Sequence, residues 1–188
     1  MAITINGSGT ITGVSAGGLP DGSITADDLA SSGTFPAWDG SALTGISAGK
    51  VLQVVQDKYS TDTQNSSGTE FATGLSADIT PSSTSSKILI LVSQNAGGSC
   101  GSSSNNLDYH IRIKRNGTVY HAIKCRYDNI TNMMIAGISH SLTYLDSPAT
   151  TSQVTYSVHM QEGNSSSKFL QAQYSNADST IMLLEIEG

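Results

Sequence analysis

The sequence predicts an all-β fold, an antiparallel, jelly-roll-like β-sandwich preceded by an extended N-terminal segment rich in Gly, Ser and Thr. The first indication is composition: charged residues make up 13% and hydrophobic residues 37% of the 188 residues, against about 25% and about 45–50% in typical domains. The difference is made up by 30 Ser, 19 Thr and 19 Gly. A helical bundle needs more of the strong helix formers. The second indication is a series of short Val-, Ile- and Tyr-rich runs between turn-forming residues, the pattern of short strands.

The chain divides into two zones of different charge. Residues 1–49 contain four Asp and neither Lys nor Arg, whereas residues 50–188 contain all nine basic residues and eleven acidic ones. Large apolar side chains are sparse in the first zone and cannot bury enough surface to offset the entropy of ordering it. We therefore predict an extended anchoring or oligomerisation segment over residues 1–49 and a β-sandwich head over residues 50–188. The other interpretation of the first zone is a tail that rests on its own domain.

The first zone contains two local patterns. Residues 3–5 and 10–12 flank a Gly-rich turn, which predicts a small hairpin. Residues 25–30 predict one helical turn capped by Thr25. The apolar side chains that we expect to anchor this segment are Ile3, Ile5, Ile11, Leu19 and Trp38.

The strands of the second zone follow from its apolar pattern. Residues 87–92 form a continuous apolar run, which is typical of a strand covered on both faces. Residues 154–161 alternate between apolar and polar side chains, as a half-buried strand does. Further strands are predicted at residues 51–55, 138–144, 169–174 and 181–186. Ile79 precedes a predicted turn at residues 81–83. Strands of this length with turn-rich connections indicate a sandwich.

Residues 109–124 give the clearest hairpin. Asn116-Gly117 lies between two strand-like arms and is the strongest two-residue signal for a type I′ turn. That turn predicts that Ile113 pairs with Tyr120 and Ile111 with Ala122 on the core side of the ribbon. The opposite side would carry Arg112 across from His121, with Lys114, Val119, His110 and Ile123 nearby.

Charge and hydropathy exclude several classes of function. The formal charge of −6 argues against a nucleic-acid partner, because such binding needs clustered cations. No apolar stretch approaches the roughly 20 residues that cross a bilayer, and the N-terminus has no signal-peptide pattern. Neither a Gly-x-Ser-x-Gly elbow nor a phosphate loop is present. We therefore expect a protein that is made in a cytoplasm and stays there or leaves as part of something larger, that is not an enzyme and that binds no cofactor or metal.

Two groups of residues are candidates for contact with another surface. The first group consists of five of the nine basic residues, Arg112, Lys114, Arg115, Lys124 and Arg126. They are expected to face acidic glycan, the acidic first zone of another copy, or only solvent. The second group lies in Ser-rich loops, predicted at residues 60–69, 97–106 and 163–168, because loop tips on a β scaffold often carry recognition. Its candidates are Ser102, Ser103, Ser104, Ser165 and Ser166.

The His, Asp and Cys residues leave alternatives open. His140 interrupts an apolar pattern, so it is either a satisfied buried histidine or one member of a ring at a symmetry axis. Asp108 and His110 share one face of a strand and are either exposed polar residues or two ligands of a metal at such an axis. Cys100, predicted in a loop, and Cys125 are either bridged or two free thiols.

Several segments also resemble a known family. Residues 3–14 (ITINGSGTITGV) and 17–24 (GGLPDGSI) resemble the N-termini of small tail-fibre-like virion proteins of marine and cyanobacterial bacteriophages. Residues 38–46 (WDGSALTGI), 49–56 (GKVLQVVQ) and 79–90 (ITPSSTSSKILI) are similar to the linker and first strands of their C-terminal β domain. These segments cover roughly half of the chain.

The resemblance implies a short homotrimeric tail fibre or spike that attaches the virion to the host surface. Its first zone would dock on other virion proteins, and its head would contact a host glycan or protein receptor. The order of the strands also resembles the jelly roll of C1q- and TNF-like trimers, whose last strand lies at the three-fold axis. That analogy implies Met182, Leu184 and Ile186 as axis residues. A capsid decoration (head fibre or cement) protein is the alternative, and a fragment of a carbohydrate-active enzyme is a third possibility.

Overall fold

The computed structural model describes residues 4–5, 11–12, 50–100, 106–129, 132–163 and 167–188. The chain divides into two units, Met1–Ile46 and Ser47–Gly188. In the first unit, β1 (Thr4–Ile5) pairs antiparallel with β2 (Ile11–Thr12), with Ile5 opposite Ile11. This pairing confirms the predicted small hairpin. The predicted turn at residues 25–30 lies outside the described residues, as do Ile3, Leu19 and Trp38.

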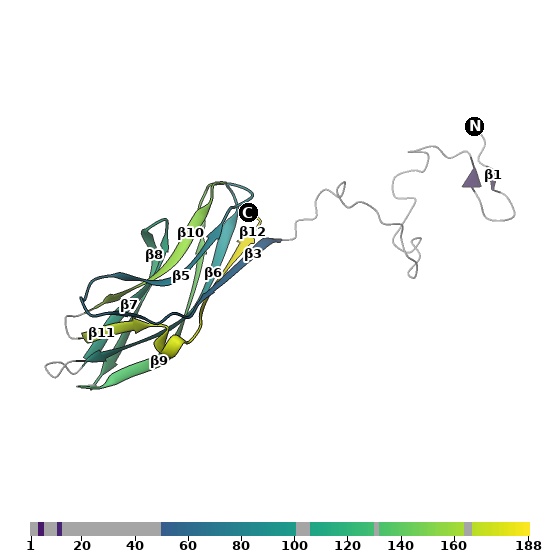
Figure 1. Ribbon diagram of the computed structural model, residues 1–188. Coiled ribbons are helices and arrows are strands. Elements are labelled where there is room, and N and C mark those ends of the chain that lie inside the picture. The colour runs from purple at the N-terminus through teal and green to yellow at the C-terminus, as the bar shows by residue number, and fades with distance from the viewer. Residues whose placement is uncertain (1–3, 6–10, 13–49, 101–105, 130–131, 164–166) are drawn as a thin grey trace. The chain divides into compact units, whose positions relative to one another are not determined.

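In its described residues, the second unit consists of strands and one short 3-10 turn (Figure 1). Its elements are β3 (Val51–Tyr59), β4 (Thr63–Asn65), β5 (Phe71–Ile79), β6 (Lys87–Cys100), β7 (Asn106–Arg115), β8 (Thr118–Asp128), β9 (Met134–Asp146), β10 (Val154–Glu162), β11 (Ser167–Ala172), η3 (Tyr174–Asn176) and β12 (Ser179–Ile186). The predicted strands at residues 51–55, 87–92, 138–144, 154–161 and 181–186 all lie within these elements.

The strands form two antiparallel sheets. The four-stranded sheet has the order β5-β10-β7-β8. In the six-stranded sheet the long strand β6 is central: β9 pairs along one side of it, and β12 and then β11 pair along the other. β3 and β4 continue this sheet beyond β12 and β11. Strands that follow one another in sequence mostly belong to different sheets, as in a jelly roll, so the predicted fold class is confirmed.

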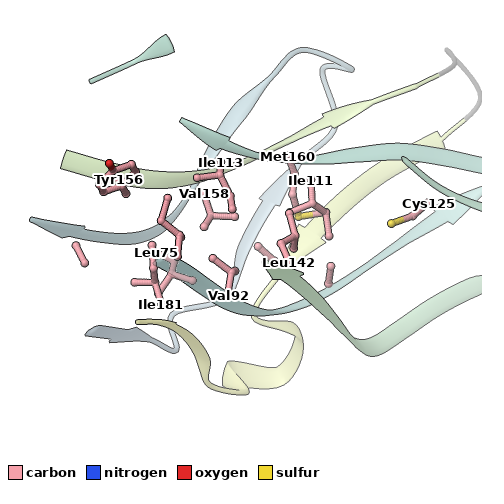
Figure 2. Close-up of a cluster of buried hydrophobic side chains, with 14 of the residues drawn as sticks. Leu75, Val92, Ile111, Ile113, Cys125, Leu142, Tyr156, Val158, Met160 and Ile181 are labelled. Atoms are coloured by element: carbon pink, nitrogen blue, oxygen red, sulfur yellow. The ribbon is translucent and has the colours of Figure 1, made fainter. Parts of the chain in front are cut away.

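Alternating side chains from both sheets build one core between them. On β10 every second residue from Val154 to Met160 is buried, and on β12 the inward residues are Ile181, Leu183 and Glu185. The largest fully buried side chains are Tyr109, Tyr156, Leu75, Ile88, Ile90, Leu107, Ile111, Ile113, Leu142, Met160, Ile181 and Leu183. Figure 2 shows that this core is long, with Tyr156 and Cys125 at its two ends.

The predicted hairpin is present, but the predicted pairing of its two strands is wrong. Asn116 and Gly117 form the turn with φ values of 47° and 86°. Next to it, Lys114 pairs with Val119, but Ile113 pairs with His121, so Tyr120 is an extra, bulged residue. Because of this bulge, His121 and Ile123 share the inner face with Ile113, and Arg112 pairs with Ala122. The Arg115 guanidinium lies 4.0 Å from the centre of the Tyr120 ring and holds the bulged side chain outside the core.

Two other expectations are corrected. Residues 97–100 were predicted as a loop, but they are the last part of β6, and all four residues are buried. Their glycines allow close approach on both sides: a Cβ on Gly97 would lie 2.4 Å from the Ile135 carbonyl oxygen, and one on Gly98 would lie 2.8 Å from that of Phe169. The predicted strand at residues 169–174 ends at Ala172, because Gln173 has a left-handed conformation and Tyr174 belongs to η3.

Candidate functional site

The sandwich has two ends with different contents. At the end that we call the terminal end, the Lys50 carbonyl accepts a hydrogen bond from the Glu187 N–H at 2.9 Å, and Ser85 donates one to the Gly188 carbonyl. At the opposite end, the loop end, the chain runs from β6 to β7, from β8 to β9 and from β10 to β11. The strand register places the ends of these strands close together, since Cys100 pairs with Ser167 and Asn106 with Asp128.

The outer face of the six-stranded sheet carries an apolar row. Cross-strand pairing aligns four residues from β3, β12, β6 and β9, in that order: Val54, Leu184, Leu89 and Leu145. Val54 is 56% exposed and Leu145 49% exposed, while the two central side chains are half-buried. A row of aligned apolar side chains on an exposed face favours burial against another surface. We call this row the apolar row.

The residues next to the apolar row extend it. Met182 and Ile186 lie on the same outer face of β12 as Leu184 and are half-buried, so the three residues implied as a trimer axis share one surface. Exposed Val51 and Leu52 begin the neighbouring strand β3. Beyond Met182 the face sinks into a shallow depression of about 310 Å³ between β12, β6 and β9. This depression is lined by Leu91, Val92, Ser93, Ser141, Leu142, Thr143, Thr180 and Met182.

The apolar run at residues 87–92 has a different burial from that expected. Its inward side chains Ile88, Ile90 and Val92 are buried, whereas Leu89 and Leu91 on the outer face are only half-buried. Within the described residues, only one face of this run is therefore fully covered. A two-sided apolar strand is typical of a sheet with both faces covered, whereas the outer side of this run is only partly covered by the described residues.

The five predicted basic residues are split between two roles. Arg112 and Lys114 both bind the Glu70 carboxylate, and Arg115 binds Asp146 at 2.7 Å. These three side chains are largely covered and act within the fold. Lys124 and Arg126 are 53% and 51% exposed on the outer face of β8. Each also lies near an acid, since Lys124 is 2.9 Å from Asp108 and Arg126 is 3.0 Å from Asp128.

Glu70 organises the outer face of the four-stranded sheet. Its carboxylate receives Arg112 at 2.6 Å, Lys114, and His159 at 3.4 Å. Burial acts to raise the pKa of Glu70, but the hydrogen bonds from Lys114 and Arg112 outweigh it and lower this pKa below 4.5. Burial and the Lys114 charge lower the pKa of His159. This face is polar and its charges are largely balanced.

His140 is a half-buried histidine whose two ring nitrogens both have partners, which is close to the first of the two interpretations. Its Nε2 lies 2.8 Å from the Tyr109 hydroxyl and its Nδ1 lies 3.5 Å from the Cys125 sulfur. Burial lowers the pKa of His140 and raises the pKa of the Cys125 thiol. Both groups are therefore neutral near pH 7. Cys100 and Cys125 are buried free thiols, and Cys100 belongs to a strand where a loop was predicted.

Asp108 and His110 do not assemble into a metal site with other ligands. Asp108 is buried and its carboxylate binds Lys124 instead. Among the described residues, no group of three or more His, Cys, Asp or Glu side chains is placed to hold a metal ion. The predicted contact residues Ser102, Ser103, Ser104, Ser165 and Ser166 lie outside the described residues. In the described part of the chain, no helix has the length and apolarity needed to span a membrane.

Comparison with known proteins finds no matching family model and no matching curated protein. Among solved structures, the chain is similar to infectious bursal disease virus VP2 in a subviral particle, with 15% identity over 71% of this chain and 38% of that chain and a TM-score of 0.33. It is also similar to the exo-β-1,3-galactanase of Phanerochaete chrysosporium with galactose, with 11% identity over 72% and 29% of the two chains and a TM-score of 0.25. The chain thus spans well under half of either protein, and neither likeness bears on its function.

Sequence reasoning named the outward residues of β12 but missed most of the apolar row. Val54, Leu89 and Leu145 belong to strands that are far apart in sequence, and only the pairing register aligns them. One signal for the row was visible, because the unbroken run at residues 87–92 required a cover on each face. The sequence alone does not show which face of this run points away from the chain's own core.

Proposed function

We propose that this chain is a non-enzymatic structural protein of a bacteriophage virion, a short trimeric fibre or spike that attaches the particle to its host. The observation that carries the proposal is the apolar row on the outer face of the six-stranded sheet. The row includes β6, whose apolar run is continuous. An apolar face of this kind is suited to permanent burial against the same face of identical subunits. The resemblance of residues 3–14 and 17–24 to phage virion proteins supports the same assignment.

The division of the sandwich into two ends agrees with this role. The chain joins the head at Lys50, at the terminal end, so residues 1–49 would connect there to other virion proteins. The opposite, loop end would face the host surface. Lys124 and Arg126 are the two of the five predicted cations that remain half-exposed for contact with an acidic glycan. Three heads on one fibre would add weak contacts into a stable attachment.

The first test is the molar mass of the 188-residue protein by light scattering after size exclusion. We expect about three times the chain mass of 19.5 kDa. A Val54→Lys variant places a charge in the apolar row at a position that is already 56% exposed. This variant should fold but dissociate. A monomeric wild-type protein at micromolar concentration would contradict the proposal.

A matched control is available on the other sheet. Val119 is 44% exposed at the start of β8, so Val119→Lys adds the same charge away from the apolar row. The Val119→Lys control should keep the trimer mass. Dissociation of both variants would show that the apolar row is not the trimer contact. Antibody labelling of particles then separates a tail fibre from the alternative, since a label on the capsid would indicate a decoration protein.

A further inference from the structure

One long side of the sandwich is closed by side chains only. β8 is the last strand of the four-stranded sheet, and β9 is the last strand beside β6 in the other sheet. In the described part of the chain, no main-chain hydrogen bond joins β8 to β9. We call the contact between these two strands the seam. Its cohesion depends on the few side chains that cross it.

Two histidines make contacts between the sheets along this side of the sandwich. On the loop-end side, His140 from β9 contacts the Tyr109 hydroxyl of β7 at 2.8 Å and the Cys125 sulfur of β8 at 3.5 Å. Nearer the terminal end, the His121 ring of β8 stacks on the Tyr144 ring of β9, with centroids 5.4 Å apart. Both histidines therefore join one sheet to the other.

The groups that face His140 offer no counter-charge to an imidazolium. From β7 it meets Tyr109, and from β8 it meets Cys125, whose thiol is neutral because burial raises its pKa. Tyr127 of β8 stacks on Tyr109. On β6, the residue paired with His140 is the buried amide Gln94.

The two acids close to the seam already have partners. Asp108 of β7 acts on the Cys125 thiol, but its carboxylate binds Lys124. Asp146, near the terminal end of β9, receives Arg115 at 2.7 Å and the Tyr156 hydroxyl at 2.6 Å. A proton on His140 would thus create a half-buried cation with two hydrogen-bonding neighbours and, among the described residues that contact it, no carboxylate.

We propose that the seam is an acid-sensitive joint: protonation of His140 opens the loop-end half of the contact between β8 and β9, while the rest of the sandwich stays folded. Opening lets water solvate the imidazolium and requires no main-chain hydrogen bond to break. The Arg115–Asp146 ion pair joins β7 to β9 near the terminal end and limits the opening. Local opening of this kind is favoured where few contacts must be lost.

Cys125 is a built-in reporter of this opening. It is 8% exposed and lies within the seam, and Cys100, the other cysteine, is fully buried. In a Cys100→Ser background, the rate of reaction with 4,4′-dithiodipyridine measures access to Cys125. The rate is divided by that of glutathione at the same pH, which removes the change in thiolate fraction. We expect this ratio to rise at least tenfold between pH 7.5 and pH 5.0.

Two variants decide whether protonation of His140 causes the rise in Cys125 reactivity at low pH. His140→Gln cannot take a proton, and its rate ratio should change less than twofold over the same pH range. His159→Gln is the matched control, because burial lowers the pKa of His159 as well but this residue contacts Glu70 on the outer face of the other sheet. The control should keep the tenfold rise. An unchanged rise in His140→Gln, or a flat wild-type ratio, would overturn the proposal.

A second measurement separates local from global opening. Circular dichroism in urea gives the free energy of complete unfolding at each pH. If the free energy of opening derived from Cys125 reactivity equals the free energy of complete unfolding at both pH values, the seam does not open separately from the rest of the sandwich. If the Cys100→Ser variant fails to fold, mass spectrometry of the labelled wild-type protein assigns the reaction to Cys125 or to Cys100 and keeps the test decisive.

Discussion

The carboxylate of Glu185 accepts hydrogen bonds from both the main-chain N–H and the hydroxyl of Ser82, each at 2.6 Å. Glu185 points into the sandwich from β12, and a further bond at 2.6 Å comes from the Gln53 side chain on β3. Burial by itself would raise the pKa of Glu185, but these hydrogen bonds outweigh it and lower the pKa to about 2. One inward carboxylate therefore fastens the turn before β6 to the first and last strands of the head.

The first prediction concerns acid stability. The folded-state pKa of Glu185 lies below the ordinary value of 4.5, so its contribution is complete above about pH 4.5 and is lost as the pH falls towards 2. Glu185→Gln should lower the free energy of unfolding at pH 7 by about 1.5–3 kcal/mol, and the difference should shrink near pH 2. Urea titrations measure both values. Glu187→Gln, at an exposed position, is the control and should change little.

The second prediction separates backbone strain from steric conflict. Gly74 has φ +88°, and a Cβ there would lie 2.2 Å from the Tyr59 ring. Gly117 has φ +86° with nothing within 4 Å of a Cβ. Gly117→Ala should cost about 1 kcal/mol from strain alone, whereas Gly74→Ala should cost about 2–4 kcal/mol. Equal losses in denaturant titrations would show that Tyr59 moves aside freely.

The third prediction concerns the Glu70 cluster. Glu70→Gln leaves Arg112 and Lys114 close together without their shared anion. The variant should lose about 1–2 kcal/mol of stability at low salt and recover part of it in 0.5 M NaCl, because salt screens like charges. Asp178→Asn removes the exposed Lys58–Asp178 pair and should cost less than about 0.5 kcal/mol. If the loss of stability in Glu70→Gln does not change with salt, packing and not charge is the main contribution of Glu70.

The fourth prediction concerns the limits of the head. A fragment of residues 50–188 should fold alone and unfold in one cooperative transition, because it keeps the Lys50 carbonyl that Glu187 binds. A fragment of residues 54–188 loses this bond and the first residues of β3, and it should melt at a lower temperature. Calorimetry of both fragments checks this. An insoluble 50–188 fragment would refute the proposed division of the chain at residue 50.

The sequence was sufficient for patterns that lie within one or two neighbouring strands. Alternation from Val154 to Met160 gave the inward face of β10, and Asn116-Gly117 gave the turn between β7 and β8. The register of that hairpin was not accessible, because the bulged Tyr120 lies against Arg115, which reaches across the sandwich to Asp146. Local turn chemistry does not contain this information.

The errors have a common physical origin in contacts between distant strands. Gly97 and Gly98 were interpreted as loop residues, yet they are glycines because β9 and β11 approach β6 closely on its two sides. The three basic residues on β7 were candidates for a contact surface, yet Glu70, which precedes β5, and Asp146 of β9 bind all three of them. In both cases the partner is far away in sequence, so composition alone gave the wrong environment.

The hydrogen bond between Lys50 and Glu187 has a consequence for engineering the head. Because the two ends of residues 50–188 meet in space, a short Gly/Ser linker can join them into a circle without crossing the sandwich. New termini can then be opened at Asn116-Gly117, an exposed turn at the terminal end. Such a circular permutant would display a fused peptide beside the original point of attachment and leave the loop end unaltered.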